Sequence, residues 1–299
     1  MTAWSVARHL DPADGVARLA ALTADGTLRA LPDELRDATL DTLLATWADG
    51  PGPLAGWSPA DGAPLAAGPL LAPFERPGTV LCAGANYACH LEEVGLAPVD
   101  GARPFFFVKP ASAIAGPAQP IAIPTAPEAR VDWEAELGVV IGRDCRDVDP
   151  AQALDHVAGY LVLNDVSARG LLAREDGVVP AMNFDWLASK GRDGFCPIGP
   201  GLTPAWLVPD PQALRITCRV NGELRQDAST AGMTFTVAEL IAEASRLTTL
   251  RPGDLVATGT PAGVAMASGA FLRPGDTVET SIDGLGTLTN PIVAAGAPA

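Results

Sequence analysis

Two glutamates spaced two residues apart stand at the start of an apolar run. Glu134 and Glu136 lie in the segment 131–137, which continues into Gly-Val-Val-Ile-Gly at 138–142. A short apolar run bounded by glycines predicts a buried or half-buried strand, with both carboxylates on one face roughly 7 Å apart along the backbone. Like charges beside an apolar core need compensation, which Mg2+, Mn2+ or Ca2+ can supply because they prefer oxygen ligands. For this pair alone, the alternative is the solvated face of an edge strand.

A third carboxylate ends another apolar run. Residues 158–164 are Ala-Gly-Tyr-Leu-Val-Leu-Asn, and Asp165 follows them directly. The end of a buried strand is a position where a third metal ligand could lie. Arg169, four residues later, could pair with an acid or hold the carboxylate of a substrate.

A histidine and a glutamate have the spacing of neighbours on a helix. His90 and Glu93 follow the short predicted strand 78–84, and they share one face if their segment is helical. A carboxylate beside an imidazole orients the ring and raises its basicity, so the pair could activate a water molecule. A surface histidine with an accidental helical neighbour is the alternative.

Two lysines and one turn complete the set of candidate residues. Lys109 ends the apolar segment 104–110, either as a cap on a strand or as a cation near the acids. Lys190 begins a glycine-rich loop without the spacing of a phosphate-binding loop. Gly259 and Thr260 lie in a tight turn after a predicted strand, where backbone N–H groups can hold a carboxylate.

The chain is predicted to consist of a small β-rich unit at 1–70 and a larger unit at 73–293. In the first, residues 37–47 have apolar side chains at helical spacing and predict a short helix with Asp37 as its N-cap. The stretch 50–69 is rich in Gly, Pro and Ala and is the predicted linker.

The composition excludes several classes of protein. The 299 residues carry a net charge of −15 without a block of Lys or Arg, which argues against binding to nucleic acid or to an anionic membrane. The 31 Gly and 28 Pro are spread along the chain and favour a strand-rich fold. The 5 cysteines are odd in number and lack CxxC spacing, and the start of the chain does not resemble a signal peptide. No apolar run approaches the length of a membrane span, so we expect a cytoplasmic protein.

Taken in order, these segments resemble the fumarylacetoacetate hydrolase family over roughly residues 73–293. Each matching segment alone is weak evidence, but six segments in the order of the family are strong evidence. The matching residues are Asn86-Tyr87 with His90 and Glu93; Phe107-Val108-Lys109-Pro110; Asp132-Trp133-Glu134 with Glu136-Leu137; Asn164-Asp165-Val166-Ser167-Ala168-Arg169; Lys190-Gly191 with Asp193, Phe195, Pro197 and Gly199-Pro200; and Thr258 to Val264.

The resemblance implies a fold and a set of roles. The fold is mostly β (α+β), with a catalytic domain of rolled mixed sheets, a small β-rich N-terminal domain and assembly as a homodimer. Mg2+ or Mn2+, with Ca2+ as a substitute in crystals, would be held by Glu134, Glu136 and Asp165. His90 with Glu93 would activate water on a lid, and Lys190 would stabilise negative charge on a substrate oxygen. The remaining implied residues, near the substrate or beside the metal ligands, are Tyr87, Lys109, Arg169, Gly259 and Thr260.

We therefore expect a metal-dependent hydrolase that cleaves a carbon–carbon bond in a 1,3-diketone or acylpyruvate-type 2-oxo acid. A metal that chelates a 2-oxo acid withdraws electrons, and an enolate can then leave. The same site could serve a 2-oxo acid decarboxylase or a hydroxy-dienoate isomerase. A protein that binds a ligand without turnover is a third alternative, against which the complete set of site residues argues.

One segment departs from the family pattern. Gly170 stands where the family commonly has Asp, and the connection 170–189 is longer and more apolar than usual. Because this segment is expected to border the substrate pocket, we expect a substrate larger or less polar than a small dicarboxylate.

Overall fold

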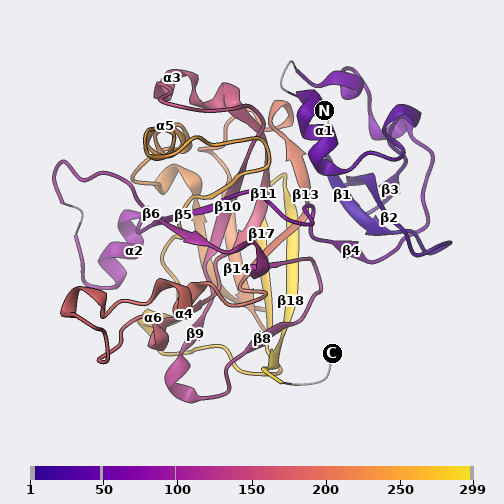
Figure 1. The fold of residues 1–299 in the computed structure, drawn as a ribbon. Helices are drawn as coiled ribbons and strands as arrows, with labels where there is room; N and C mark the ends of the chain where they lie inside the picture. The colour runs from indigo at the N-terminus through magenta and orange to yellow at the C-terminus, as the bar shows by residue number, and fades with distance from the viewer. Residues whose placement is uncertain (1–3, 48–49, 98, 297–299) are drawn as a thin grey trace.

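A large mixed sheet forms the centre of the protein. The computed structural model describes residues 4–47, 50–97 and 99–296, and this sheet has 11 strands (Figure 1). Its order is β3 (Leu28–Arg29), β2 (Ala17–Thr23), β1 (Trp4–Leu10), β13 (Cys196–Pro204), β11 (Val157–Asn164), β10 (Ala135–Ile141), β16 (Leu255–Ala257), β5 (Val80–Gly84) and β6 (Phe105–Lys109), with β4 (Leu70–Leu71) on β1 and β7 (Ile114–Ala115) on β13.

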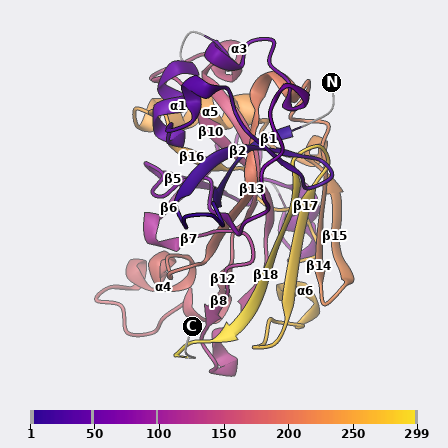
Figure 2. The same ribbon diagram turned by 90° about the vertical axis from the view of Figure 1, so that its right-hand side faces the viewer.

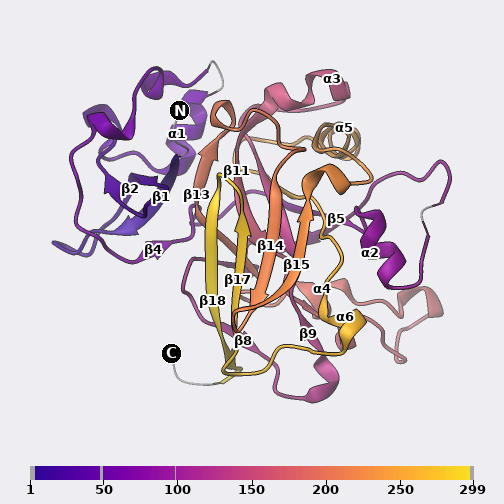
Figure 3. The ribbon, with the colours of Figure 1, turned by 180° about the vertical axis from the view of Figure 1, so that it is seen from behind.

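A second sheet packs against the first and lies nearest the viewer in Figure 3. Its five strands are β15 (Glu223–Ser229), β14 (Arg215–Val220), β17 (Thr277–Ile282), β18 (Gly286–Ala294) and β8 (Ile121–Ile123). In β14 every second side chain is buried, as expected for a strand with one face on the core. Every residue of β10 and β11 is buried, because both faces of these strands are covered. The predicted mostly β, α+β fold is confirmed.

The N-terminal strands are continuous with the rest of the large sheet. Strand β1 pairs along its length with β2, and Val6 also lies opposite Leu202 of β13. The three strands lie side by side in Figure 2. The sheet therefore crosses the predicted boundary between 1–70 and 73–293, and the division into two domains stays a prediction.

Two local expectations for the N-terminal part were wrong. Helix α1 (Leu40–Thr46) begins three residues after Asp37, and its N-cap is Thr39, whose hydroxyl oxygen accepts from the Thr42 amide at 3.2 Å. The predicted linker 50–69 is folded, because Trp57 packs edge-on against Trp4 of β1 with ring centroids 5.3 Å apart. Its glycines and prolines build short 3-10 turns within a packed structure.

Short helices cover the ends of the sheets. They are α2 (Ala88–Glu93), α3 (Pro150–Ala153), α4 (Trp186–Lys190), α5 (Val237–Leu247) and α6 (Ala265–Ser268), of which α2 is the next element after strand β5. Among the residues that the structure describes, no helix has the length and apolar character needed to cross a membrane.

Candidate active site

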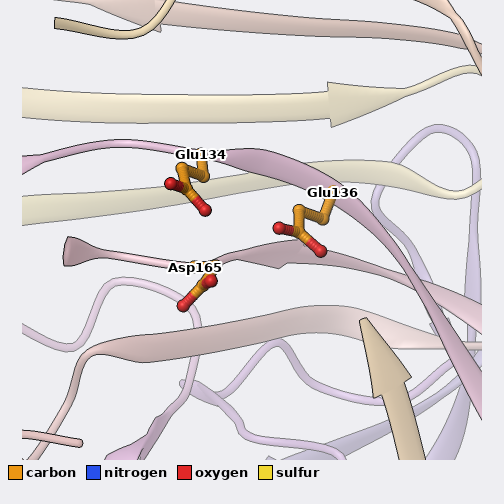
Figure 4. Close-up of side chains that lie close together, drawn as sticks. All are labelled: Glu134, Glu136 and Asp165. Atoms are coloured by element: carbon orange, nitrogen blue, oxygen red, sulfur yellow. The ribbon is translucent and has the colours of Figure 1, made fainter. Parts of the chain in front are cut away.

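The pairing of β10 with β11 brings the three predicted metal ligands together. Ala135 lies opposite Asn164 in this antiparallel pair, so Glu134 and Asp165 are the next residues along the same register. The Asp165 amide donates to the Glu134 carbonyl, and the Asn164 side chain accepts from the Glu134 amide, both at 2.9 Å. One carboxylate oxygen from each of Glu134, Glu136 and Asp165 lies within 4.8 Å of the others, and the three side chains converge in Figure 4.

Three cations neutralise part of this buried charge. Lys190, the last residue of α4, donates to Glu134 at 2.8 Å and to Asp165 at 2.5 Å. Lys109, the last residue of β6, donates to Asp165 and to two backbone carbonyls at 2.7 and 3.0 Å. Arg169 contacts Glu134 through one terminal nitrogen. All three cations come from segments distant in sequence from β10.

The charges of these neighbours set the protonation of the acids. Burial, together with the charges of Asp165 and Glu134, raises the pKa of Glu136 well above its usual value. Burial also acts to raise the pKa of Glu134, but Arg169 and Lys190 outweigh it and hold that pKa below its usual value. Burial acts to lower the pKa of Lys190, but Asp165 and Glu134 more than reverse this and raise it.

Glu136 is the acid whose charge is left uncompensated. It is 1% exposed, and in the described part of the chain its carboxylate contacts no Lys, Arg or His. Its hydrogen-bond partner is the Gly259 amide, at 2.7 Å. A buried carboxylate beside two others is stable as an anion only if a further cation reaches it. Since all the donor atoms are carboxylate oxygens, the residues fit a hard divalent cation such as Mg2+ or Mn2+.

The turn after β16 holds two carboxylates of the protein itself. The Gly259 amide binds Glu136, and the Gly263 amide donates to both carboxylate oxygens of Glu93 at 2.9 and 3.0 Å. The Thr260 hydroxyl donates to the Ala135 carbonyl at 2.9 Å. One turn therefore fixes a candidate metal ligand and the predicted water-activating helix at the same time.

The predicted dyad lies on α2, as the spacing indicated. His90 Nδ1 and the nearer Glu93 carboxylate oxygen are 3.8 Å apart, which is too long for a hydrogen bond. The side chains are 12% and 21% exposed, so both are partly shielded from solvent. His90 Nδ1 is buried, with no hydrogen-bond partner among the described residues. A small movement of the His90 ring toward Glu93 would bring Nδ1 and the carboxylate within hydrogen-bond distance.

The structure assigns other contacts to several residues that the resemblance placed near the substrate. All three N–H donors of Lys109, the N–H of Gly259 and the O–H of Thr260 are used by protein groups. These donors are therefore occupied in the structure, and the substrate-binding role of the three residues stays a prediction. Tyr87 is fully buried, and its hydroxyl has no partner among the described residues, so its predicted role stays open.

Sequence reasoning assigned no function to two polar residues that support the site. Gln226 of β15 accepts from the Ala135 amide at 3.0 Å and donates to Thr260 at 2.9 Å, which ties the second sheet to the acidic strand. Asp132, two residues before Glu134, accepts from Arg169 at 3.0 Å. The two-residue spacing of Asp132, Glu134 and Glu136 could have indicated a role for Asp132. No local sequence pattern indicates a role for Gln226.

Comparison with known proteins identifies the family. The profile described as "Fumarylacetoacetate (FAA) hydrolase C-terminal" matches residues 79–293. The chain belongs to the fumarylacetoacetate hydrolase family. Its match with the mitochondrial oxaloacetate tautomerase fahd2 of Xenopus laevis is 44% identical over 226 residues, which are 75% of this chain and 68% of that protein.

Solved structures of the family resemble the whole chain. A 2-hydroxyhepta-2,4-diene-1,7-dioate isomerase from Mycobacterium marinum superposes with a TM-score of 0.71 at 34% identity, covering 98% of this chain and 99% of the other. Maleylpyruvate hydrolase from Sphingobium sp. SYK-6, in complex with manganese(II) and pyruvate, gives a TM-score of 0.76 at 30% identity, covering 97% and 99%. Relatives of this protein are thus named as hydrolases, isomerases and tautomerases.

Proposed function

We propose that this protein is a divalent-metal-dependent hydrolase that cleaves a carbon–carbon bond of a 1,3-diketone or acylpyruvate-type 2-oxo acid. The observation that carries the proposal is Glu136, a buried carboxylate within 4.8 Å of two others and without a cation of its own. The metal would be Mg2+ or Mn2+, held by Glu134, Glu136 and Asp165. The maleylpyruvate hydrolase with bound manganese and pyruvate supports this assignment.

The charge of the buried cluster supports an anionic substrate. The cluster holds four carboxylates, those of the three proposed ligands and Asp132, and three cations, Lys109, Arg169 and Lys190, which pair with Glu134, Asp165 and Asp132. With all of them ionised, the cluster carries one negative charge, and a divalent cation would turn it into one positive charge. A single carboxylate, such as the one at the end of a 2-oxo acid, would then bring the site to neutrality.

The site residues have separate roles in the proposed reaction. A metal bound to the three acids supplies Lewis acidity, polarising the 2-oxo acid. Lys190 uses two N–H donors on Glu134 and Asp165, which leaves the third for the oxygen of a developing enolate. His90, oriented by Glu93, would take a proton from water as the water oxygen attacks the distal carbonyl. The carbon–carbon bond then breaks, its electrons form the enolate, and the enolate carbon receives the proton back from His90 to give pyruvate.

A tautomerase is the second candidate, because the Xenopus laevis relative is named as one. Tautomerisation needs the same enolate stabilisation and a proton shuttle, but no attack by water. A 2-oxo acid decarboxylase would use the same enolate and release CO2. These three reactions differ in their products.

Product analysis separates the three reactions. The Mn2+-loaded protein is incubated with an acylpyruvate and, separately, with oxaloacetate, while products are followed by NMR and CO2 is measured. We expect a free carboxylic acid and pyruvate from the acylpyruvate without CO2. Exchange of the keto and enol forms without cleavage would make it a tautomerase, and CO2 from oxaloacetate would make it a decarboxylase.

We also propose that the protein is a homodimer in which β6 lies at the interface. Strand β6 is one of the two end strands of the large sheet, and α4 packs beside it, with Trp186 stacked on Phe107. Nearby, Arg174 pairs with both Asp176 and Asp185. Large exposed apolar side chains are present on β6, in the segment before it and in the segment 178–187: Leu96, Val99, Phe105, Val108, Val178, Val179, Met182, Phe184 and Leu187.

The substitution Val108→Lys is expected to convert the dimer into a monomer. Val108 is 57% exposed, so the folded chain accommodates lysine, but two lysines at a twofold interface would repel each other and bury charge. Light scattering after size-exclusion chromatography measures the mass. Leu224→Lys, at a 41% exposed position on β15, is the control and should leave the mass unchanged. A dimeric Val108→Lys protein would place the interface elsewhere.

A cytoplasmic location is proposed on the chemistry of the cysteines. All five are free thiols, and four of them are buried. Free thiols in this number are typical of a reducing compartment.

A further inference from the structure

We propose that Asp132 and Arg169 act together as a positioning pair that holds the Glu134 carboxylate in its metal-binding orientation. This inference rests on the proposed metal site. It assigns a function to Asp132 and changes the expected role of Arg169 from binding substrate to orienting a metal ligand.

The Asp132 carboxylate is buried and accepts hydrogen bonds at both of its oxygens. It has no exposed surface, and its first carboxylate oxygen accepts from the amides of Trp133 at 2.8 Å and Ala265 at 2.7 Å. Its second oxygen accepts from the Met266 amide at 3.2 Å and from Arg169 Nε at 3.0 Å. Backbone amides on both sides thus fix the carboxylate, and a fixed carboxylate can fix the guanidinium that it binds.

Arg169 connects Asp132 to Glu134. Its Nε binds Asp132 while its Nη2 contacts Glu134, so one planar group spans both acids. Within the described residues, the Glu134 carboxylate accepts from no backbone amide and contacts only Arg169 and Lys190 among the cations. It also lies between β9 (Val131–Asp132) and β10, outside the regular ladder of either strand. Its orientation therefore depends on side-chain partners.

A lysine at 169 could not do the same work. The donors of a lysine ammonium group rotate freely, whereas the planar guanidinium presents its N–H groups in a rigid fork that holds two acids at a fixed angle to each other. The Arg169 side chain is 14% exposed; its Nε donates to Asp132, and its Nη2 lies in ion-pair contact with Glu134 without a hydrogen-bond partner among the described residues.

A purely structural role for Asp132 is the rival explanation. Its contacts with Ala265 and Met266 anchor the first turn of α6, and their loss alone would lower stability without changing metal affinity. Metal affinity measured on the folded protein separates the two explanations.

The test uses Mn2+ binding, measured by the loss of the free-ion EPR signal on the full-length protein without substrate. Asp132→Asn keeps an oxygen for the backbone amides but loses the charge that holds Arg169. We expect its Mn2+ affinity to fall about 10–100-fold, as is usual for residues that orient metal ligands. Asp254→Asn is the matched control, because Asp254 is also buried and accepts from two amides but has no ion pair with any described residue. Its affinity should stay within about twofold of the parent.

Coupling between the two residues decides whether Asp132 acts through Arg169. Arg169→Met should weaken Mn2+ binding as much as Asp132→Asn, and the double variant should be no weaker than Arg169→Met within about twofold. Additive losses, or an Asp132→Asn protein with parental affinity, would overturn the pair.

Arg169→Lys keeps the test decisive if Asp132→Asn does not fold. It retains the positive charge, so we expect the fold to persist and Mn2+ affinity to fall about 10-fold or more. Parental affinity in this variant, with only the KM for substrate raised, would return Arg169 to substrate binding. Failure of the parent protein to bind Mn2+ would instead overturn the metal site itself.

Discussion

The Glu136→Gln protein is expected to lose metal binding and turnover while becoming more stable than the parent in the absence of metal. Glu136 is buried beside Glu134 and Asp165, and burial and these charges raise its pKa. Glutamine removes the repulsion but keeps an oxygen for the Gly259 amide. Mutation of a residue that only orients a metal ligand lowers metal affinity by up to roughly 100-fold. Because Glu136 is proposed as a ligand itself, its loss should reduce Mn2+ affinity by more than that. Relief of about 1 kcal/mol of repulsion would raise Tm by about 2–4 °C.

Titration with Mn2+ and thermal unfolding with and without metal measure both effects. Glu243→Gln is the matched control, because Glu243 is 8% exposed and lies on α5, where it pairs with Arg103 and Arg246. It should keep parental Mn2+ affinity. A Glu136→Gln protein that binds Mn2+ as the parent does would remove this carboxylate from the metal site.

The His90→Ala protein is expected to lose turnover by about 10²–10⁴-fold, the usual range for a missing general base. Its Mn2+ affinity should be unchanged, because the proposed ligands are the three carboxylates and not the imidazole. Glu93 would stay bound to the Gly263 amide, so α2 should keep its place. Steady-state turnover of the Mn2+-loaded variant measures the loss.

His156→Ala provides the comparison for this variant. His156 also has a buried Nδ1 without a partner among the described residues, but it lies in the turn before β11, on an element that carries no proposed site residue. Its turnover should equal that of the parent. Undiminished turnover in His90→Ala would take the imidazole out of the reaction.

The sequence was sufficient to predict the three acids but not how they meet. The two-residue spacing of Glu134 and Glu136 implies a shared face on any strand. Their approach to Asp165 depends on the register between β10 and β11, which is set by packing across the whole sheet. The cations Lys109 and Lys190 reach the acids from β6 and α4, and such long-range contacts have no local signature.

Gly170 shows how tertiary structure explains a departure from the family pattern. A Cβ at this position would lie 1.6 Å from the Glu128 carbonyl oxygen, so the backbone of 127–129 packs directly against residue 170. An aspartate there would require that turn to move. The glycine therefore permits a close contact between two backbone segments next to Arg169, where the resemblance to the family had led us to expect an acid.

The most direct test of the metal site is anomalous X-ray diffraction from crystals of the protein grown with Mn2+. We predict one anomalous peak per chain, enclosed by the carboxylate oxygens of Glu134, Glu136 and Asp165 and absent from crystals of Glu136→Gln. A peak at another position, or no peak at a Mn2+ concentration that supports turnover, would contradict a metal-dependent reaction at these three acids.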